Sequence, residues 1–268
     1  MTDEVKAVLL GVVEGLTEFL PVSSTGHLVL FGDAIEFHGA LASTFEIFIQ
    51  LGAILAVVCL YFSRFSSLIP ISSNNARGGL AGLSGCCKLA VACLPAFLLG
   101  PLVHSTIKEY LFFPFPVAVA LIVGGVVLIA IDRGDRKARV LDVDELTLKQ
   151  CFGIGIFQCA ALWPGVSRSG ATIIGGMLLG LERKVAAEFS FLLAVPVMFA
   201  ATAYDLLKSH AAFSGSDFAV FGLGFAVSFF VALFAIHFFL KLIGTHTMAP
   251  FGYYRIILGA VVLGVLLL

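Results

Sequence analysis

Long apolar segments recur along the whole chain, and they constrain its fold more than any other feature. A helix that crosses a bilayer needs about 17–25 mostly apolar residues. Six segments have this length, at roughly 43–63, 87–103, 114–132, 186–207, 219–242 and 250–268. Charged residues make up only 12% of the chain, whereas a soluble domain has about 25%. The sequence therefore predicts an all-α polytopic membrane protein that forms a single integral membrane domain over 1–268.

Two further apolar segments, 5–37 and 148–182, are interrupted near their middles. Proline and glycine break them within "FLPVSSTG" and "WPGVSRSG". Irregular backbone at membrane depth is tolerated only where protein or a water-filled cavity surrounds it. We therefore expect both breaks to be buried or to line a polar pocket.

The distribution of lysine and arginine predicts the orientation of these segments. The loops 64–86 and 133–149 are separated by two crossings and carry Arg64, Arg77, Arg133, Arg136, Lys137, Arg139 and Lys149. The positive-inside rule makes their shared side cytoplasmic. With Arg183 and Lys184 also cytoplasmic, 148–182 is a re-entrant hairpin from the cytoplasm, and 5–37 is a hairpin from outside.

An internal repeat agrees with this topology. A shift of 144 residues places "PVSSTG" at 21–26 on "GVSRSG" at 165–170, without a gap. The same shift pairs Gly11 with Gly155 and Glu14 with Gln158. Identity between the halves is low, but charge counting independently gives them opposite orientation. We therefore predict inverted repeats over approximately 1–132 and 148–268.

The first break begins with two carboxylates on one helical face. Glu14 and Glu18 are four residues apart, so they stack on the same side of a helix and repel each other. Each charge near a bilayer centre costs about 2.5–3.5 kcal/mol on insertion scales. They could lie at a shallow, solvated position. Alternatively they hold a divalent metal, Mg²⁺ or Ca²⁺, or orient a base.

After Pro21 the chain is expected to restart as a helix, with Ser23 or Ser24 as its N-cap. The free N–H groups and the helix dipole of that first turn favour an anion. His27 falls three residues after Ser24, within reach of acting on its hydroxyl or on a water. The alternative is that the hydroxyls only cap the helix and His27 only packs.

The second break repeats this design with one change. Ser167 and Ser169 take the places of Ser23 and Thr25, but Arg168 replaces Ser24. A guanidinium presents a fork of donors suited to phosphate. Its partner is either an anionic substrate or the Glu14/Glu18 pair. If the two tips meet, the predicted phosphate site consists of Ser23, Thr25, Gly26, Ser167, Arg168, Ser169 and Gly170.

The motifs "EGLTEFLPVSSTGH" and "ALWPGVSRSGAT" closely resemble the two signatures of the undecaprenyl-pyrophosphate phosphatase family, the bacitracin-resistance family. The resemblance extends to "FEIFIQLGAILAV" and "AAEFSFLLAVP" and, in size and hydropathy, to the whole chain. It implies an inner-membrane hydrolase that regenerates undecaprenyl phosphate, the carrier lipid of cell-wall synthesis, from its pyrophosphate. It also implies a divalent cation and a site open to the outer, periplasmic face.

When the family's motif residues are matched to this chain, the resemblance implies that Ser24, His27, Glu18 and Arg168 are catalytic. It also implies that Glu14 and Glu18 are the metal ligands. Two mechanisms stay open. Ser24, assisted by His27, attacks phosphorus, or His27 activates water while Ser24 binds.

A lipid-phosphate transporter or flippase is the main alternative, because inverted repeats with broken helices are common in transporters. Other polar residues in the crossings, Glu46, Gln50, Glu188 and Asp205, either orient the motif residues or bond between helices. We expect a polyprenyl diphosphate and membrane lipid as partners and no nucleic acid, and a homo-oligomer is possible.

Overall fold

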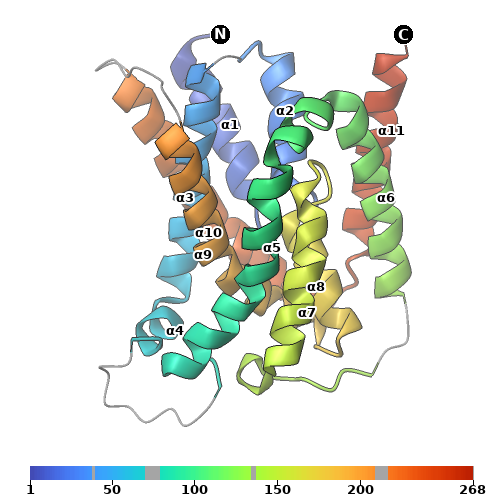
Figure 1. The fold of residues 1–268 in the computed structure, drawn as a ribbon. Coiled ribbons are helices and arrows are strands. Elements are labelled where there is room, and N and C mark those ends of the chain that lie inside the picture. The colour runs from blue at the N-terminus through green and yellow to red at the C-terminus, as the bar shows by residue number, and fades with distance from the viewer. Residues whose placement is uncertain (38–39, 70–78, 134–136, 209–216, 268) are drawn as a thin grey trace.

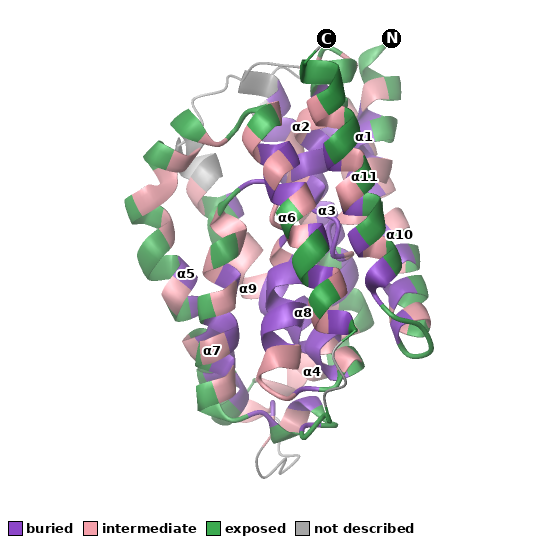
Figure 2. Ribbon diagram, turned by 90° about the vertical axis from the view of Figure 1, so that its right-hand side faces the viewer, coloured by how far each residue is buried: buried purple, intermediate pink, exposed green. Residues whose placement is uncertain are grey.

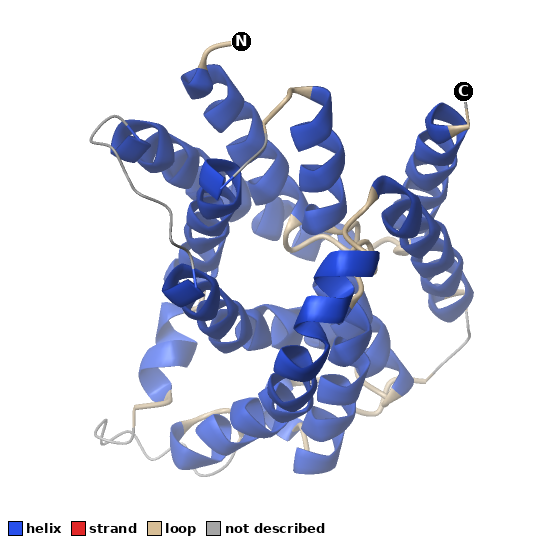
Figure 3. Cartoon of the chain, turned by 45° about the horizontal axis from the view of Figure 1, so that its top comes forward, coloured by secondary structure: helices blue, strands red, loops and turns tan. Residues whose placement is uncertain are grey.

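The computed structural model describes residues 1–37, 40–69, 79–133, 137–208 and 217–267. Regular structure in these ranges is helical, apart from one isolated bridge between Val140 and Leu181 (Figure 3). The α-helices are α1 (Asp3–Thr17), α2 (Ser24–Ala34), α3 (Ala40–Leu60), α4 (Phe62–Ser67), α5 (Gly82–Tyr110), α6 (Pro114–Asp132), α7 (Leu148–Cys159), α8 (Arg168–Leu178), α9 (Arg183–Lys208), α10 (Asp217–Ile243) and α11 (Ala249–Leu266). Two short 3₁₀ helices, η1 (Val143–Glu145) and η2 (Ala160–Leu162), precede and follow α7.

Among the described residues, five helices are long and apolar enough to cross a membrane, which confirms a multi-pass membrane protein. They are α5, α6, α9, α10 and α11. The sixth predicted crossing, 43–63, is not among them. It corresponds to α3, which is 21 residues long, but only the stretch Thr44–Leu60 lies wholly among the residues whose side chains the structure describes. The predicted count of six therefore stays a prediction, with five crossings supported by length and composition.

Both predicted breaks are present, and each separates two antiparallel helices. α1 and α2 form one helix pair, and α7 with η2 and α8 forms the other. The two pairs enter the bundle from opposite ends, and their turns approach each other in its middle (Figures 1 and 3). Figure 2 shows α8 as the most deeply enclosed helix, and its residues from Ser169 to Gly176 are all buried.

Equivalent glycines bring each helix pair against a long helix. A Cβ on Gly11 would lie 2.8 Å from Gly224 O, so α1 packs closely on α10. A Cβ on Gly155 would lie 2.3 Å from Ala92 O, so α7 packs equally closely on α5. Gly11 and Gly155 are the residues paired by the 144-residue shift. This packing supports the predicted repeat, and the inverted repeat as a whole stays a prediction.

The two basic connections lie at one end of the bundle, as the charge distribution predicts. Arg64 in α4 donates to Asp144 Oδ2 in the connection between α6 and α7, at 2.8 Å. Leu80 N–H donates to Asp144 Oδ1 at 2.7 Å, and Lys88 Nζ donates to Asp144 O at 3.3 Å. Through its carboxylate and its backbone carbonyl, Asp144 therefore ties α4 and the start of α5 to the connection after α6, at the lower end of Figure 1.

The contacts of the Asp144 carboxylate should make the stability of the fold decrease at acidic pH. Partial burial raises the pKa of Asp144, but the bonds from Leu80 N–H and Arg64 outweigh it and hold the pKa below its ordinary value of 3.8. The stabilisation is therefore present above that value and is lost as the pH falls through the folded-state pKa. We expect Asp144→Asn to cost about 1 kcal/mol or less at neutral pH. Thermal unfolding in detergent, compared at neutral pH and about pH 3, should show the difference from wild type shrinking in acid. A constant difference would contradict the assignment, and exposed Glu182→Gln is the control.

Candidate active site

The first helix pair turns through a serine in an unusual backbone conformation. Ser23 has φ 72° and ψ 92°, in the left-handed region that non-glycine residues rarely adopt. Its hydroxyl accepts a hydrogen bond from Gly26 N–H at 3.3 Å, and α2 begins at the next residue. Of the two predicted N-caps, the cap is therefore Ser23. This leaves the Ser24 hydroxyl free for another partner.

The second helix pair turns in the same way. Ser167 has φ 77° and ψ 116°, and its hydroxyl accepts from Gly170 N–H at 3.1 Å. α8 begins at Arg168, as α2 begins at Ser24. The two strained serines are 144 residues apart, so the predicted correspondence between the breaks holds in backbone detail. Each turn presents the N-terminus of a helix, where the dipole favours negative charge.

The tips of the two helix pairs are in direct contact. Ser169 Oγ donates to Leu20 O at 2.7 Å. The Nη2 atom of Arg168 lies 2.9 Å from Glu18 Oε1, and both side chains are largely buried. Residues that the sequence places about 150 positions apart are therefore joined, as the predicted meeting of the tips requires.

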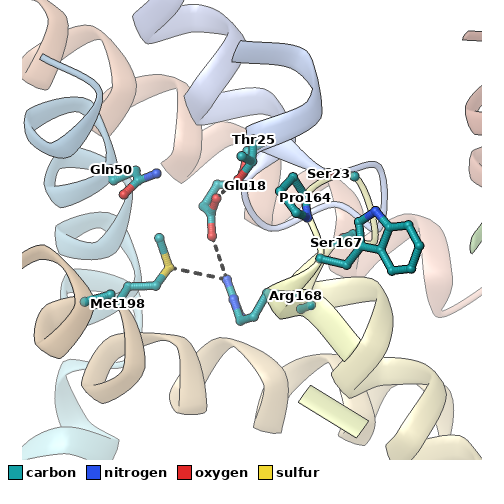
Figure 4. A pocket seen from close by; sticks show the side chains of 13 residues that line it. Glu18, Ser23, Thr25, Gln50, Pro164, Ser167, Arg168 and Met198 are labelled. Atoms are coloured by element: carbon teal, nitrogen blue, oxygen red, sulfur yellow. Dashed lines mark hydrogen bonds and ion pairs between the residues drawn. The ribbon is translucent and has the colours of Figure 1, made fainter. Parts of the chain in front are cut away.

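A cavity of about 230 Å³ lies where the tips meet. Glu18, Ser23, Ser24 and Thr25 line it from the first turn, and Ser167 and Arg168 line it from the second (Figure 4). Its remaining walls come from Gln50, Ala161, Trp163, Pro164, Gly165, Met198 and Ala201. The cavity thus combines two helix N-termini, four hydroxyls, one guanidinium and one carboxylate. This is a set of groups suited to an anionic substrate.

Glu18 is the residue that connects the reactive groups. The Ser24 hydroxyl donates a short hydrogen bond to Glu18 Oε2, while Oε1 pairs with Arg168. A carboxylate that already accepts a hydrogen bond from a hydroxyl is placed to act as its general base. The structure therefore offers Glu18 as the proton acceptor beside Ser24.

Arg168 is held from several sides. Its Nη1 donates to Ser190 O at 3.0 Å, Nη2 lies 3.6 Å from Met198 Sδ, and the guanidinium sits 5.8 Å from the centre of the Phe19 ring. Its predicted contact with the Glu14/Glu18 pair is made through Glu18. These contacts fix the fork of donors at the cavity wall, with Nε making no hydrogen bond.

His27 does not meet Ser24. Its Nδ1 lies 2.8 Å from Ser23 O, and its Nε2 lies 2.6 Å from the hydroxyl of Tyr254 in α11. Because a carbonyl only accepts, Nδ1 carries the proton, and Nε2 of the neutral ring accepts from Tyr254. His27 is 2% exposed and is not part of the cavity lining. The geometry assigns it to supporting the strained Ser23 turn, not to the predicted contact with the Ser24 hydroxyl.

Tyr254→Phe tests this arrangement of His27. The variant keeps the stacked rings, whose centroids are 5.6 Å apart, and removes the hydroxyl that donates to Nε2. A buried acceptor left unpaired costs about 1–3 kcal/mol of stability. We expect a lower melting temperature and a fall in turnover of about 10- to 100-fold, because a positioning contact is lost. A loss above about 1000-fold in a folded variant would place the pair in the chemistry instead.

Glu14 lies one helical turn before Glu18, has no exposed surface and is not among the residues that line the cavity. Neither of its oxygens has a hydrogen-bond partner of ordinary geometry, and Glu18 is the neighbour that acts on it most strongly, ahead of Glu46 and Arg168. The described residues contain no group of three or more His, Cys, Asp or Glu side chains that could hold a metal ion. Glu14 and Glu18 would therefore need oxygens from the substrate to complete a cation site, as Mg²⁺ commonly does with phosphates.

The other predicted polar residues have mixed positions. Gln50 lines the cavity, whereas Glu188 lies 3.7 Å from Arg64, toward the basic end. The side chain of Asp205 falls outside the described residues. Three residues of the predicted phosphate site, Gly26, Ser169 and Gly170, are buried behind the lining, where their N–H or hydroxyl groups serve the turns.

Comparison with known proteins agrees with this geometry. The profile of the family described as "Bacitracin resistance protein BacA" matches residues 7–261. The chain belongs to this family. It is 51% identical over 262 residues to a protein of Nitratidesulfovibrio vulgaris and equally identical to one of Solidesulfovibrio magneticus, with 98% of each chain covered. A protein of Laribacter hongkongensis is 46% identical, covering 97% of this chain and 93% of its own. All three relatives are named undecaprenyl-diphosphatase.

Two residues that contribute to the site of this family member were missed in the sequence. Tyr254 and Arg255 are neighbours in α11, far along the chain from both motifs. Tyr254 contacts His27, and Arg255 donates to the carbonyls of both turns. One signal could have identified Arg255: an ionisable residue within an apolar crossing is by default a candidate for function.

Proposed function

We propose that this chain is an integral membrane phosphatase that hydrolyses undecaprenyl pyrophosphate to undecaprenyl phosphate and inorganic phosphate. The name shared by its relatives supports this substrate. The observation that carries the proposal is the contact of Glu18 with both Ser24 and Arg168 at a cavity between two helix N-termini. Carrier-lipid recycling for cell-wall synthesis and bacitracin resistance follow from that activity.

Binding of the diphosphate would use the groups that line the cavity. Arg168 offers a fixed fork of donors, and the N-termini of α2 and α8 offer partial positive charge from two directions. The hydroxyls of Ser23, Ser24 and Thr25 add neutral donors. Phosphoryl transfer depends mainly on positioning and on stabilising charge spread over oxygens. Converging donors of this kind supply both.

The reaction has two balanced routes that share one proton acceptor. In the first, Ser24 Oγ forms a bond to the terminal phosphorus as the bond to the bridging oxygen breaks. Glu18 takes the hydroxyl proton, undecaprenyl phosphate leaves, and water then hydrolyses the phosphoserine. In the second, water attacks the terminal phosphorus directly and gives its proton to Glu18, while the bond to the bridging oxygen breaks and undecaprenyl phosphate leaves. Trapping of phosphate on Ser24 distinguishes the two routes.

A divalent cation, Mg²⁺ or Ca²⁺, would be held by Glu14 and Glu18 together with substrate oxygens. The orphaned, fully buried carboxylate of Glu14 supports this assignment, because an unpaired charge there needs a cation or a proton. When bound, the ion would neutralise charge on the diphosphate. Glu14→Gln should then raise the Mg²⁺ concentration needed for half-maximal turnover. The melting temperature of the variant should change little.

The proposed setting is the bacterial inner membrane. The end that carries α4 and the connection after α6 is basic, so we place it in the cytoplasm. The α1–α2 pair then enters from outside and the α7–α8 pair from the cytoplasm, as two halves of an inverted repeat. We propose that the cavity is reached from the outer, periplasmic face, where the lipid diphosphate is released by polymer synthesis.

Release of phosphate from a polyprenyl diphosphate by the purified protein in detergent tests the proposal. Detergent micelles have no second compartment, so transport alone would give no signal in this assay. The names of the relatives do not favour the transporter alternative. We expect steady release that falls when a chelator is added and returns with Mg²⁺. If folded protein released phosphate no faster than a sample without enzyme, both with and without Mg²⁺, the proposal would be overturned.

A further inference from the structure

Arg255 is a buried cation for which the catalytic scheme has no role. It lies in α11 with 1% of its surface exposed. A guanidinium taken out of water is costly unless its donors are paired. The position of Arg255 in the membrane-embedded bundle therefore requires a compensating set of contacts.

The hydrogen bonds of Arg255 lead to both catalytic turns. Its Nη1 donates to Pro21 O at 3.0 Å, and its Nη2 donates to Gly165 O at 2.9 Å. Pro21 and Gly165 are equivalent under the 144-residue shift, and each stands two residues before a strained N-cap serine. A single guanidinium thus spans corresponding atoms of the two halves.

The remaining donors of Arg255 anchor it to a third element. Nε donates to Leu121 O at 3.3 Å, and Nη2 donates to Ala120 O at 3.2 Å, both in α6. All four acceptors are backbone carbonyls. The fork geometry of arginine satisfies them together, whereas the single ammonium of lysine cannot reach the same set.

Glycine opposite the guanidinium makes room for this arrangement. A Cβ on Gly124 would lie 2.0 Å from Arg255 Nη2 and 2.7 Å from Cζ. A Cβ on Gly170, in the first turn of α8, would lie 3.3 Å from Nη1. The guanidinium therefore occupies a tightly defined space between α6 and the two turns.

We propose that Arg255 is a positioning residue that sets the distance between the two phosphate-binding turns. Its bonds to Pro21 O and Gly165 O fix the turns that hold Ser23 and Ser167. These turns in turn place Ser24 and Arg168 at the cavity, which Arg255 itself does not line. The inference rests on the proposed function for its catalytic consequence. A displacement of about 1 Å in such a site can cost about 100-fold in rate.

The test displaces the guanidinium without removing it. Gly124→Ala places a methyl group against Arg255, and Arg255→Lys keeps the charge but loses the fork. The matched control is Gly264→Ala, because a Cβ there meets nothing within 4 Å. In detergent we expect both test variants to lower kcat for phosphate release by about 30–100-fold, with KM changed by less than about threefold. Gly264→Ala should match wild type.

Trp163 supplies a readout that does not need turnover. It is the only tryptophan of the chain and lies in the second turn, two residues before Gly165. In ligand-free protein its emission maximum should shift in Gly124→Ala and stay unchanged in Gly264→Ala. Wild-type kcat together with an unshifted maximum in folded Gly124→Ala and Arg255→Lys would overturn the inference. Absence of phosphate release from wild type would overturn the proposed function instead, and the emission comparison would still test Arg255.

Discussion

Arg168→Ala is expected to lower phosphate release from a polyprenyl diphosphate by about 1000-fold or more, the range for loss of an arginine that stabilises phosphoryl transfer. The variant removes the fork held at the cavity wall by Ser190 O and Met198. It also leaves the buried carboxylate of Glu18 without its cation. Steady-state release in detergent, with the folded state checked by melting temperature, measures the effect.

Two controls separate charge from geometry at this position. Arg168→Lys keeps a positive charge without the planar fork and should recover only part of the loss. Arg139→Ala changes an exposed arginine far from the tips and should leave turnover unchanged. Because His27 supports a turn and Arg168 faces the cavity, Arg168→Ala should be at least as damaging as His27→Ala. Near-normal turnover in Arg168→Ala together with an inactive His27→Ala would reverse this ranking and contradict the account.

Glu18→Gln is the second variant with a large expected effect. The amide keeps the size of the side chain and an acceptor for the Ser24 hydroxyl, but it cannot take a proton or pair with Arg168 as an anion. Loss of a general base costs about 100- to 10,000-fold in rate. We expect kcat to fall within that range while the protein remains folded, as measured by phosphate release at saturating lipid substrate.

Glu188→Gln is the matched control for this charge removal. Glu188 lies on α9 but faces Arg64 at 3.7 Å, toward the basic end of the bundle. Its neutralisation should change turnover by less than about threefold, since weak, partly exposed ion pairs contribute little. Equal losses in Glu18→Gln and Glu188→Gln would mean that charge in general, and not the base at Ser24, limits the reaction.

Much of the site could be predicted because its determinants are local. Pro21 and the glycines specify where the helices break, and serine at each break specifies an N-cap. The balance of lysine and arginine then implied that the breaks approach from opposite sides. That topology brought Arg168 to the first turn, and the ion pair with Glu18 confirms that the two tips meet.

The partner of His27 could not be predicted from spacing. Residues three apart on a helix are neighbours, so Ser24 was a reasonable candidate. The direction of the imidazole is instead set by Tyr254, which is 227 residues away in the chain. Ser24 turns to Glu18, six residues earlier, across the break. Contacts between remote elements decided both side chains, and no local pattern records them.

The crossing predicted at 43–63 corresponds to α3, which spans Ala40–Leu60 and ends where Tyr61 leads into α4. Tyr61 and Phe62 are themselves apolar, so hydropathy places the end of the segment slightly too late. Arg255 went unrecognised because a single polar residue does little to the hydropathy of the crossing that contains it.

A double-mutant cycle of Glu18→Asp and Arg168→Lys tests most directly whether the two turns form one phosphate site. Each substitution shortens or reshapes one side of the same ion pair, so the second should add little once the first has broken it. We predict that phosphate release by the double variant stays within about threefold of the slower single variant. A double variant whose loss equals the product of the two single losses would show independent residues, and that result would contradict a shared site.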